Sequence, residues 1–249
     1  MKDQFVIAYL ADLSMADEVM SHAAFLASML NKGLILLYVE DQQYKNTPHA
    51  QVTGTLQQLE AKYSHVNPAH VAMRGKTQEV INALPTMLNG VVAVAGVNAG
   101  ARRGSLTHPR QVLRLFSQCK IAYLTVQAQL LSPQAYSSVA YGVDFRKESK
   151  EKLIWASYFA RFGASRLTML HFDYSDEGLR AKWHNNVLFM KKFFKGLGVS
   201  YEDGVVSGRA LFPETIICQS AYDRGCGLLI SVTTDTRDLE IVEWFAGTQ

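Results

Sequence analysis

Hydrophobic residues recur along the first half of this chain in short unbroken runs, separated by longer amphipathic segments. The run at 34–39, Leu-Ile-Leu-Leu-Tyr-Val, shows no alternation with polar residues, which is typical of a strand buried on both faces of a parallel sheet. The intervening segments carry apolar residues at helical spacing. The pattern predicts strands at 5–12, 34–39, 69–74, 91–96 and 121–126, and helices at about 14–31, 54–64, 77–88 and 108–118. Ser14 is the expected N-cap of the first helix, and Gly33 its expected left-handed cap.

The second half repeats this order of elements. Residues 5–12 form an apolar run that ends in Asp12, and residues 139–144 form a run that ends in Asp144. The second half predicts strands at 139–144, 167–172, 199–206 and 228–232, and helices at about 147–162, 176–196 and 212–224. It contains no equivalent of residues 108–126, the last helix and strand of the first half.

This repeat predicts two tandem α/β modules, at 1–127 and 138–249, joined by a linker at 127–138. Alternating strands and helices imply a five-stranded parallel open sheet with helices on both faces of each module. The second module is expected to lack its last helix and strand. The unpaired sheet edge that this leaves could pair with a second copy, so a homodimer is one expectation.

Composition excludes several classes of protein. Hydrophobic residues make up 48% of the chain and charged residues 19%, which is typical of a globular protein. No apolar stretch is long enough to span a membrane, no signal peptide is evident, and the three cysteines form no disulfide or metal motif. A cytoplasmic location is therefore expected. Residues 1–127 carry 11 Lys and Arg against 8 Asp and Glu, too few to predict a nucleic-acid interface.

Ligands of doubly wound sheets bind beyond the carboxyl ends of the strands. In the first half, the residues expected at those ends are Asp12, Glu40, Asp41, Gly75 and Gly96, and in the second half they are Asp144, Asp173 and Gly208. Each strand-ending aspartate either contacts a ligand or caps the following helix. Arg102 and Arg103, in a cluster with His108, Arg110 and Arg114, either hold phosphate groups or form a solvated basic loop.

The strand-ending aspartates, the glycines Gly75 and Gly208 after the third strands, and the run Val-Ala-Val-Ala-Gly96 together resemble the universal stress protein family, in its tandem two-domain form. The resemblance implies a five-stranded sheet with four helices in each domain, and pairing of domains through the last strand. In the nucleotide-binding branch, a Gly-x2-Gly-x9-Gly-Ser/Thr loop follows strand four and holds phosphates. Here Gly96 is followed by Gly100, one position late, and Pro109-Arg110 stand where the final Gly-Ser is expected.

Other motifs do not form a catalytic constellation. Gly75-Lys76-Thr77 imitates the end of a P-loop but lacks its first glycine, because His70 occupies that position. No metal-binding spacing of His or Cys and no nucleophile elbow occurs. His171 lies in a buried strand and is expected to be a hydrogen-bonded core residue.

Two functions remain in competition. The first is a non-catalytic stress-response protein, built as an intramolecular pseudo-dimer, which acts through protein partners whose identity the sequence leaves open. The second is a regulatory switch that binds ATP or another phosphorylated ligand in the first module. Its expected contacts are Asp12, Val39, Gly96, Gly100, Arg102 and Arg103, with Asp144 as the equivalent in the second module.

Overall fold

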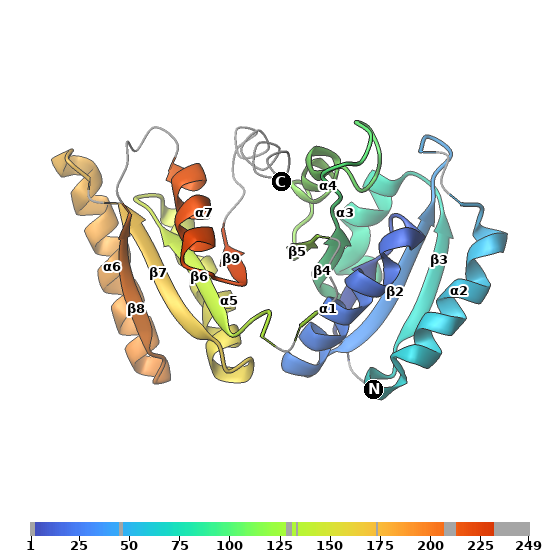
Figure 1. The fold of residues 1–249 in the computed structure, drawn as a ribbon, viewed down its shortest axis with the longest axis horizontal. Helices are drawn as coiled ribbons and strands as arrows, with labels where there is room; N and C mark the ends of the chain where they lie inside the picture. Colours follow the sequence, from blue (N-terminus) through green and yellow to red (C-terminus); the bar gives the residue numbers. More distant parts are fainter. Residues whose placement is uncertain are drawn as a thin grey trace. The chain divides into compact units, whose positions relative to one another are not determined.

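The structure, a computed structural model, describes residues 3–44, 47–127, 131–132, 134–172, 174–206 and 213–231. Contacts divide these residues into two units, of which the first ends at Leu131 and the second begins at Ser132. Figure 1 shows that each unit is an α/β sheet flanked by helices. The predictions for Asp173, for Gly208 and for the chain beyond residue 231 fall outside the described residues.

Unit 1 contains a five-stranded sheet in the order β3-β2-β1-β4-β5. Every neighbouring pair of strands is parallel, which confirms the predicted fold class for this half. Its strands are β1 (Phe5–Tyr9), β2 (Gly33–Glu40), β3 (Ala69–Arg74), β4 (Gly90–Gly96) and β5 (Ala122–Val126). Its helices are η1 (Leu13–Met15, a 3₁₀ helix), α1 (Ala16–Met29), α2 (His49–Lys62), η2 (Ser64–Val66, also 3₁₀), α3 (Thr77–Met87) and α4 (Pro109–Phe116).

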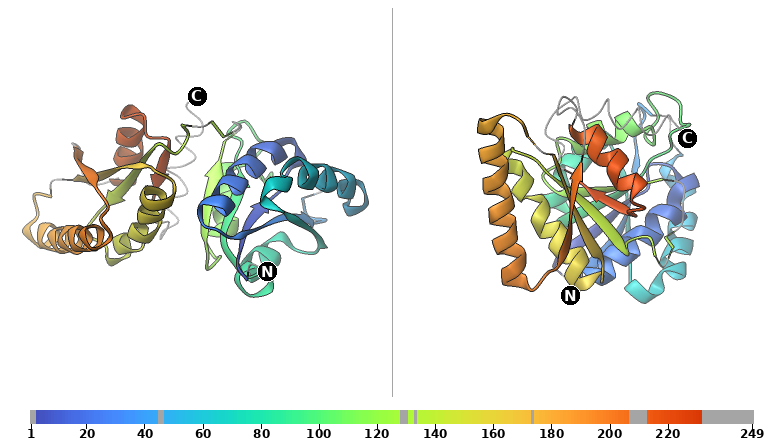
Figure 2. Two further views of the ribbon diagram at one scale, coloured as in Figure 1. Left: turned by 90° about the horizontal axis from the view of Figure 1, so that it is seen from below. Right: turned by 60° about the vertical axis from the view of Figure 1, so that its left-hand side comes forward.

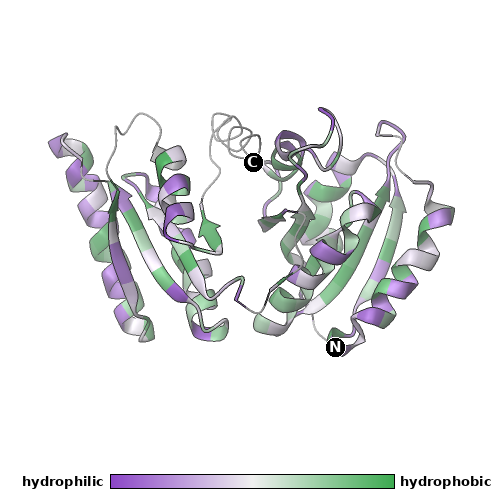
Figure 3. Cartoon of the chain, viewed as in Figure 1, coloured by the Kyte–Doolittle hydropathy of each residue, from purple (hydrophilic) through white to green (hydrophobic). Residues whose placement is uncertain are grey.

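The core of unit 1 lies on both faces of this sheet. Odd-numbered residues of β1, such as Tyr9, pack with β2, β4, α3 and α4 in one buried cluster. The opposite face is covered by α1 and α2 (Figure 2). Because both faces are covered, the central strands are apolar along their length (Figure 3). The unbroken hydrophobic run at 34–39 is explained by this double burial.

Unit 2 has the same order of elements with fewer strands. The described residues form a four-stranded parallel sheet in the order β8-β7-β6-β9. Its strands are β6 (Ser138–Val143), β7 (Arg166–Phe172), β8 (Tyr201–Val206) and β9 (Leu228–Ile230). Its helices are η3 (Lys147–Lys150, a 3₁₀ helix), α5 (Lys152–Phe162), α6 (Glu177–Leu197) and α7 (Pro213–Asp223).

The role predicted for Gly33 is wrong. The left-handed residue that ends the first helical segment is Asn31, with a φ of 53°, and Gly33 is already the first residue of β2. A β-carbon at Gly33 would lie 2.4 Å from Cδ1 of Phe5 on β1. Glycine is therefore required here for close packing between two strands rather than for backbone conformation.

Several predicted boundaries also differ from the structure, and β1 ends at Tyr9 rather than at residue 12. Helix α2 begins at His49, five residues earlier than expected, because Pro48 immediately precedes its first turn. The predicted linker contains Tyr136, which is buried and packs edge-on against Phe159 of α5, with ring centroids 5.4 Å apart. The residues just before β6 are thus part of the packed body of unit 2.

Candidate functional site

The strand order of unit 1 places a topological switch point between β1 and β4. These strands are neighbours, with Tyr9 paired to Ala95, while the chain leaves them toward opposite edges of the sheet. Asp12 follows β1 and Gly96 ends β4, so both lie at the carboxyl edge beside this crevice. In open α/β sheets this is where ligands bind.

Asp12 lies exposed at this edge. Its Oδ1 accepts a hydrogen bond from the backbone N–H of Ser14 at 2.9 Å, so Asp12 is the N-cap of η1. The predicted N-cap, Ser14, is wrong, because the 3₁₀ turn comes first and α1 begins only at Ala16. The Asp12 side chain is exposed, so it combines this capping role with contact to solvent.

Val39 lies in β2, next to its last residue. Its side chain is 1% exposed and packs in the cluster beneath α3 and α4. It can therefore meet a ligand only through its backbone.

The P-loop-like segment Gly75-Lys76-Thr77 takes part in a hydrogen bond that stabilises the fold. The buried Asp41 accepts hydrogen bonds from the backbone N–H groups of Thr77, at 2.7 Å, and Gln43, at 3.0 Å. Burial raises the pKa of Asp41, but these hydrogen bonds outweigh it, and the pKa lies below its ordinary value. The N–H that a P-loop would offer to a phosphate thus binds a carboxylate of the protein.

The loop between β4 and α4 is folded upon itself. Its ends are tied by the N–H of Asn98, which donates to the carbonyl of Thr107 at 2.8 Å. The Asn98 side chain accepts from the N–H of Gly100 at 2.9 Å, and the Asn98 carbonyl accepts from Ala101 at 3.0 Å. Further along, the N–H of His108 donates to the carbonyl of Ser105 at 3.1 Å. Backbone donors that cradle phosphate in a glycine-rich loop are here used internally.

The two glycines of this region have different tasks. A β-carbon at Gly96 would lie 3.0 Å from Cε of Met15 and 3.2 Å from Cγ2 of Val19, so glycine lets α1 approach β4. Gly100 is exposed, and its nearest neighbour is the side chain of Asn98. Neither glycine is positioned by a positive φ.

Arg102 and Arg103 are exposed on this loop. Among the described residues neither guanidinium has a carboxylate within 4.0 Å, and neither bonds to Asp12. The sequence explains this isolation, since no acidic residue occurs between Glu79 and Asp144. Within the described part of the chain, both guanidinium groups are therefore exposed and without an acidic neighbour.

The second strand-ending aspartate has a different environment. Asp144 is 3% exposed and accepts hydrogen bonds from the N–H of Arg146 at 2.9 Å, from its Nε at 2.8 Å, and from the hydroxyl of Ser149. Burial raises the pKa of Asp144, but the charge of the buried Lys152 and the contacts with Arg146 and Ser149 outweigh it, so the pKa lies below its ordinary value. This carboxylate is held by the protein itself.

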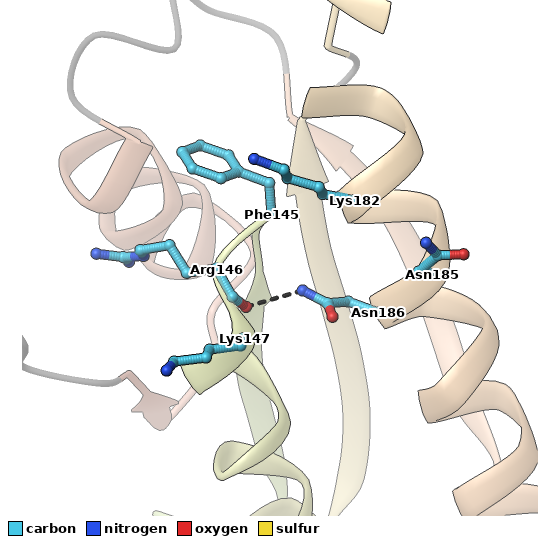
Figure 4. A pocket seen from close by; sticks show the side chains of 6 residues that line it. All are labelled: Phe145, Arg146, Lys147, Lys182, Asn185 and Asn186. Atoms are coloured by element: carbon cyan, nitrogen blue, oxygen red, sulfur yellow. Dashed lines mark hydrogen bonds between the residues drawn. The ribbon is translucent and has the colours of Figure 1, made fainter. Parts of the chain in front are cut away.

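Beside Asp144 lies a hollow of about 430 Å³ that the sequence reasoning missed. Figure 4 shows the loop after β6 on one side and α6 on the other. Its lining residues are Phe145, Arg146, Lys147, Lys182, Asn185 and Asn186. Two signals could have indicated it: the Arg-Lys pair that follows the aspartate, and three polar residues of α6 at i, i+3 and i+4.

Metal-binding clusters and membrane-spanning helices are absent from the described part of the chain. No group of three His, Cys, Asp or Glu side chains there could hold a metal ion. None of its helices has the length and apolarity needed to cross a membrane. His171 is buried, with Nε2 2.7 Å from Oδ1 of Asp203 and its ring against Trp183, at 4.9 Å between centroids. It is a hydrogen-bonded core residue, as predicted.

Comparison with known proteins places the fold. The sequence matches no protein-family model and no curated protein. The structure is similar to a universal stress protein from Archaeoglobus fulgidus DSM 4304, with a TM-score of 0.72 at 12% identity, over 99% of this chain and 92% of that one. It is also similar to a protein of unknown function from Pseudomonas aeruginosa PAO1, with a TM-score of 0.64 at 12% identity, over 96% of this chain and 88% of that one. A universal stress protein in complex with cAMP matches 51% of this chain and 98% of its own, with a TM-score of 0.41 at 12% identity. The chain has the tandem fold of universal stress proteins.

Proposed function

We propose that this chain is a non-catalytic stress-response protein whose first unit has lost the phosphate-binding loop of its nucleotide-binding relatives. The observation that carries the proposal is the internal hydrogen bonding of the loop between β4 and α4. Asn98 accepts hydrogen bonds from the N–H groups of Gly100 and Ala101, and its own N–H donates to the carbonyl of Thr107. A phosphate would have to break these bonds before it could use the same donors, which removes the advantage of a preformed site.

A second candidate function is a nucleotide switch in unit 1. It is favoured by the exposed carboxylate of Asp12 and by the exposed guanidinium groups of Arg102 and Arg103 on the loop after β4. Arginine side chains can bind a triphosphate without backbone donors, and they do so bidentately. In this reading ATP is held by charge, and any turnover is slow.

Titration separates the two candidates. Purified protein is titrated with ATP, ADP and AMP by calorimetry at physiological salt, beside the variant Arg102→Ala/Arg103→Ala. The non-catalytic proposal predicts that the double substitution changes no nucleotide affinity and that ATP is not hydrolysed. Saturable ATP binding that the double substitution abolishes would overturn it in favour of the switch.

We further infer that the two units act as an intramolecular pseudo-dimer, in the cytoplasm, and that signalling passes through protein partners. The support is the match to a universal stress protein over 99% of this chain and 92% of that one, together with the repeat of the fold in the two units and the three free cysteines. Light scattering tests the pairing. A mass near 27.7 kDa supports pairing within one chain, whereas twice that mass contradicts it in favour of a homodimer.

A further inference from the structure

Helix α6 has one face buried in unit 2 and the opposite face in solvent. The buried face repeats at helical spacing, with Val187, Met190 and Phe194 each at most 4% exposed. Phe194 packs edge-on against Tyr141 of β6, with ring centroids 5.7 Å apart. Because the buried face is anchored in this way, the orientation of the solvent face is fixed before any partner arrives.

The solvent face of α6 carries a stripe of lysines beside exposed apolar residues. Leu188 is followed by lysines at i+3, i+4 and i+7, which places all four side chains on one face of the helix. These lysines are exposed, and Leu188 itself is 43% exposed. Next to the stripe, Phe189 is 46% exposed, and the ammonium of Lys150 lies over its ring, 4.9 Å from the centroid. We call this surface the lysine face; its residues are Lys150, Leu188, Phe189, Lys191, Lys192 and Lys195.

The charge of the lysine face is not balanced by its surroundings. Helix α6 contains five Lys and Arg residues against one acidic residue, Glu177, which lies in its first turn. Residues 128–249 carry 14 Lys and Arg against 14 Asp and Glu, so the positive charge of α6 is a local concentration. Among the described residues, no carboxylate lies within 4.0 Å of the ammonium groups of Lys191, Lys192 and Lys195. The surface therefore attracts anions along the helix rather than at one point.

The types of residue on the lysine face favour one class of partner. Lysine is a flexible point charge, whereas arginine is the residue suited to binding a single phosphate bidentately. Four lysines on a convex helix thus suit a surface with many spread negative charges. Leu188 and Phe189 lie among these lysines, and the phosphates and sugars of a nucleic-acid backbone offer no apolar layer to bury them. A lipid bilayer offers such a layer directly below its headgroups.

We propose that the lysine face binds the surface of an anionic lipid bilayer, with the lysines at the headgroups and with Leu188 and Phe189 below them. The binding is peripheral, since α6 lies along the bilayer while its other face stays packed on the sheet. Because the charged contacts are exposed, the affinity falls as salt is added. The proposal is independent of the proposed function, because it involves no residue of unit 1 and no nucleotide.

The test uses the full chain and sedimentation with vesicles of phosphatidylcholine, alone or mixed with phosphatidylserine, at a salt concentration of about 0.1 M. Lys191→Gln/Lys192→Gln removes two charges at little cost in helix propensity. Each lysine near an anionic surface raises the affinity about fivefold, so this variant should bind the mixed vesicles roughly twentyfold more weakly than wild type. Lys76→Gln/Lys120→Gln is the matched control, because it makes the same change of net charge at exposed positions of unit 1. The control should stay within about twofold of wild type, and vesicles of phosphatidylcholine alone should bind weakly.

A second variant tests the apolar part of the contact. Leu188→Gln/Phe189→Gln should weaken binding to the mixed vesicles about tenfold, because two side chains no longer enter the apolar layer. The decrease of affinity with salt should stay as in wild type, since no charge is removed. Circular dichroism checks that each variant keeps its helices.

Three results would overturn the proposal. The first is no sedimentation with the mixed vesicles. The second is an equal loss in the two lysine variants, which would indicate attraction by net charge alone. The third is binding to a DNA duplex or to poly-glutamate that depends on Lys191 and Lys192, without binding to vesicles, which would indicate a nucleic acid or an acidic protein as the partner. The nucleotide titrations of unit 1 do not bear on these outcomes, so failure of one proposal is distinguishable from failure of the other.

Discussion

Asp12 and Asp144 occupy equivalent positions at the ends of β1 and β6, so the same substitution can be made in both units. Replacing either aspartate by asparagine keeps the shape of the side chain and removes one negative charge. We expect the two variants to differ widely in stability, because one carboxylate is exposed and the other is buried.

The expected cost at Asp144 follows from what the carboxylate contacts. It is 3% exposed and holds Arg146 and Ser149, with the buried Lys152 nearby. Breaking a buried ion pair by removing one partner costs roughly 3–5 kcal/mol. Asparagine keeps part of the hydrogen bonding, so we expect Asp144→Asn to lower the free energy of unfolding by about 3 kcal/mol. Asparagine caps a helix as well as aspartate does. Asp12→Asn should therefore change the free energy of unfolding by less than about 0.5 kcal/mol.

Urea unfolding followed by tryptophan fluorescence measures both variants. Trp155 and Trp183 lie in unit 2, and the described residues of unit 1 contain no tryptophan, so circular dichroism is recorded in parallel to cover unit 1. Equal shifts of the two variants in both signals would refute the reasoning that burial and pairing distinguish the two aspartates. A loss confined to Asp12→Asn would refute it more strongly.

Acid gives a second measurement of the same interaction. The pKa of Asp144 is lower in the folded chain than its ordinary value of about 4. Its contribution to stability is therefore complete above that value and is lost as the pH falls through the lower, folded pKa. The stability difference between wild type and Asp144→Asn should be constant near neutral pH and should shrink below about pH 4. A difference that grows on acidification would contradict this sign.

Three further substitutions test the packing of the two units by thermal or urea unfolding. Gly227→Ala should destabilise unit 2 by about 3 kcal/mol or prevent its folding, because the new β-carbon would lie 1.7 Å from the carbonyl oxygen of Ala135. A variant as stable as wild type would contradict this close contact between Gly227 and Ala135. Gly196→Ala, in α6 with no atom within 4 Å, should instead stabilise by roughly 0.5–1 kcal/mol, and a loss would show a contact that the structure lacks. Tyr9→Phe should change stability by less than about 1 kcal/mol, because the buried hydroxyl has no hydrogen-bond partner of good geometry among the described residues, although Thr77 lies near it. A larger loss would show that the two hydroxyl groups are bonded.

The strands and helices were predictable because both faces of each sheet are covered. Double burial requires unbroken apolar runs, such as that of β2, and these are visible in a single sequence. Errors occurred where a residue type serves more than one purpose. Gly33 was predicted as a helix cap, but the ring of Phe5 occupies the space where a β-carbon of residue 33 would lie. Such a contact between residues distant in sequence is not visible in a local pattern.

The candidate site was less predictable than the fold. The sequence pattern indicates that Asp12 follows β1 and that Gly96 ends β4, because the apolar runs mark where the strands end; their role toward a ligand stays a prediction. The state of the loop after β4 depends on hydrogen bonds among Asn98, Gly100 and Thr107, which glycine spacing alone does not specify. The hollow of unit 2 was missed because it joins two segments about 40 residues apart, and the contact of Asn186 with the loop is tertiary.

The contrast between the two units lies in the residue two positions after each aspartate. In unit 1 this residue is Ser14, which donates only its backbone N–H, so the Asp12 carboxylate stays at the surface. In unit 2 it is Arg146, whose backbone and side chain both bind Asp144 and draw the carboxylate into a buried ion pair. The same strand–aspartate motif therefore leaves an anionic group exposed in one unit and places it in a buried ion pair in the other. For this reason the two aspartates are expected to differ in what they contribute, Asp144 to stability and Asp12 to the surface of the carboxyl edge, although the folds of the two units are alike.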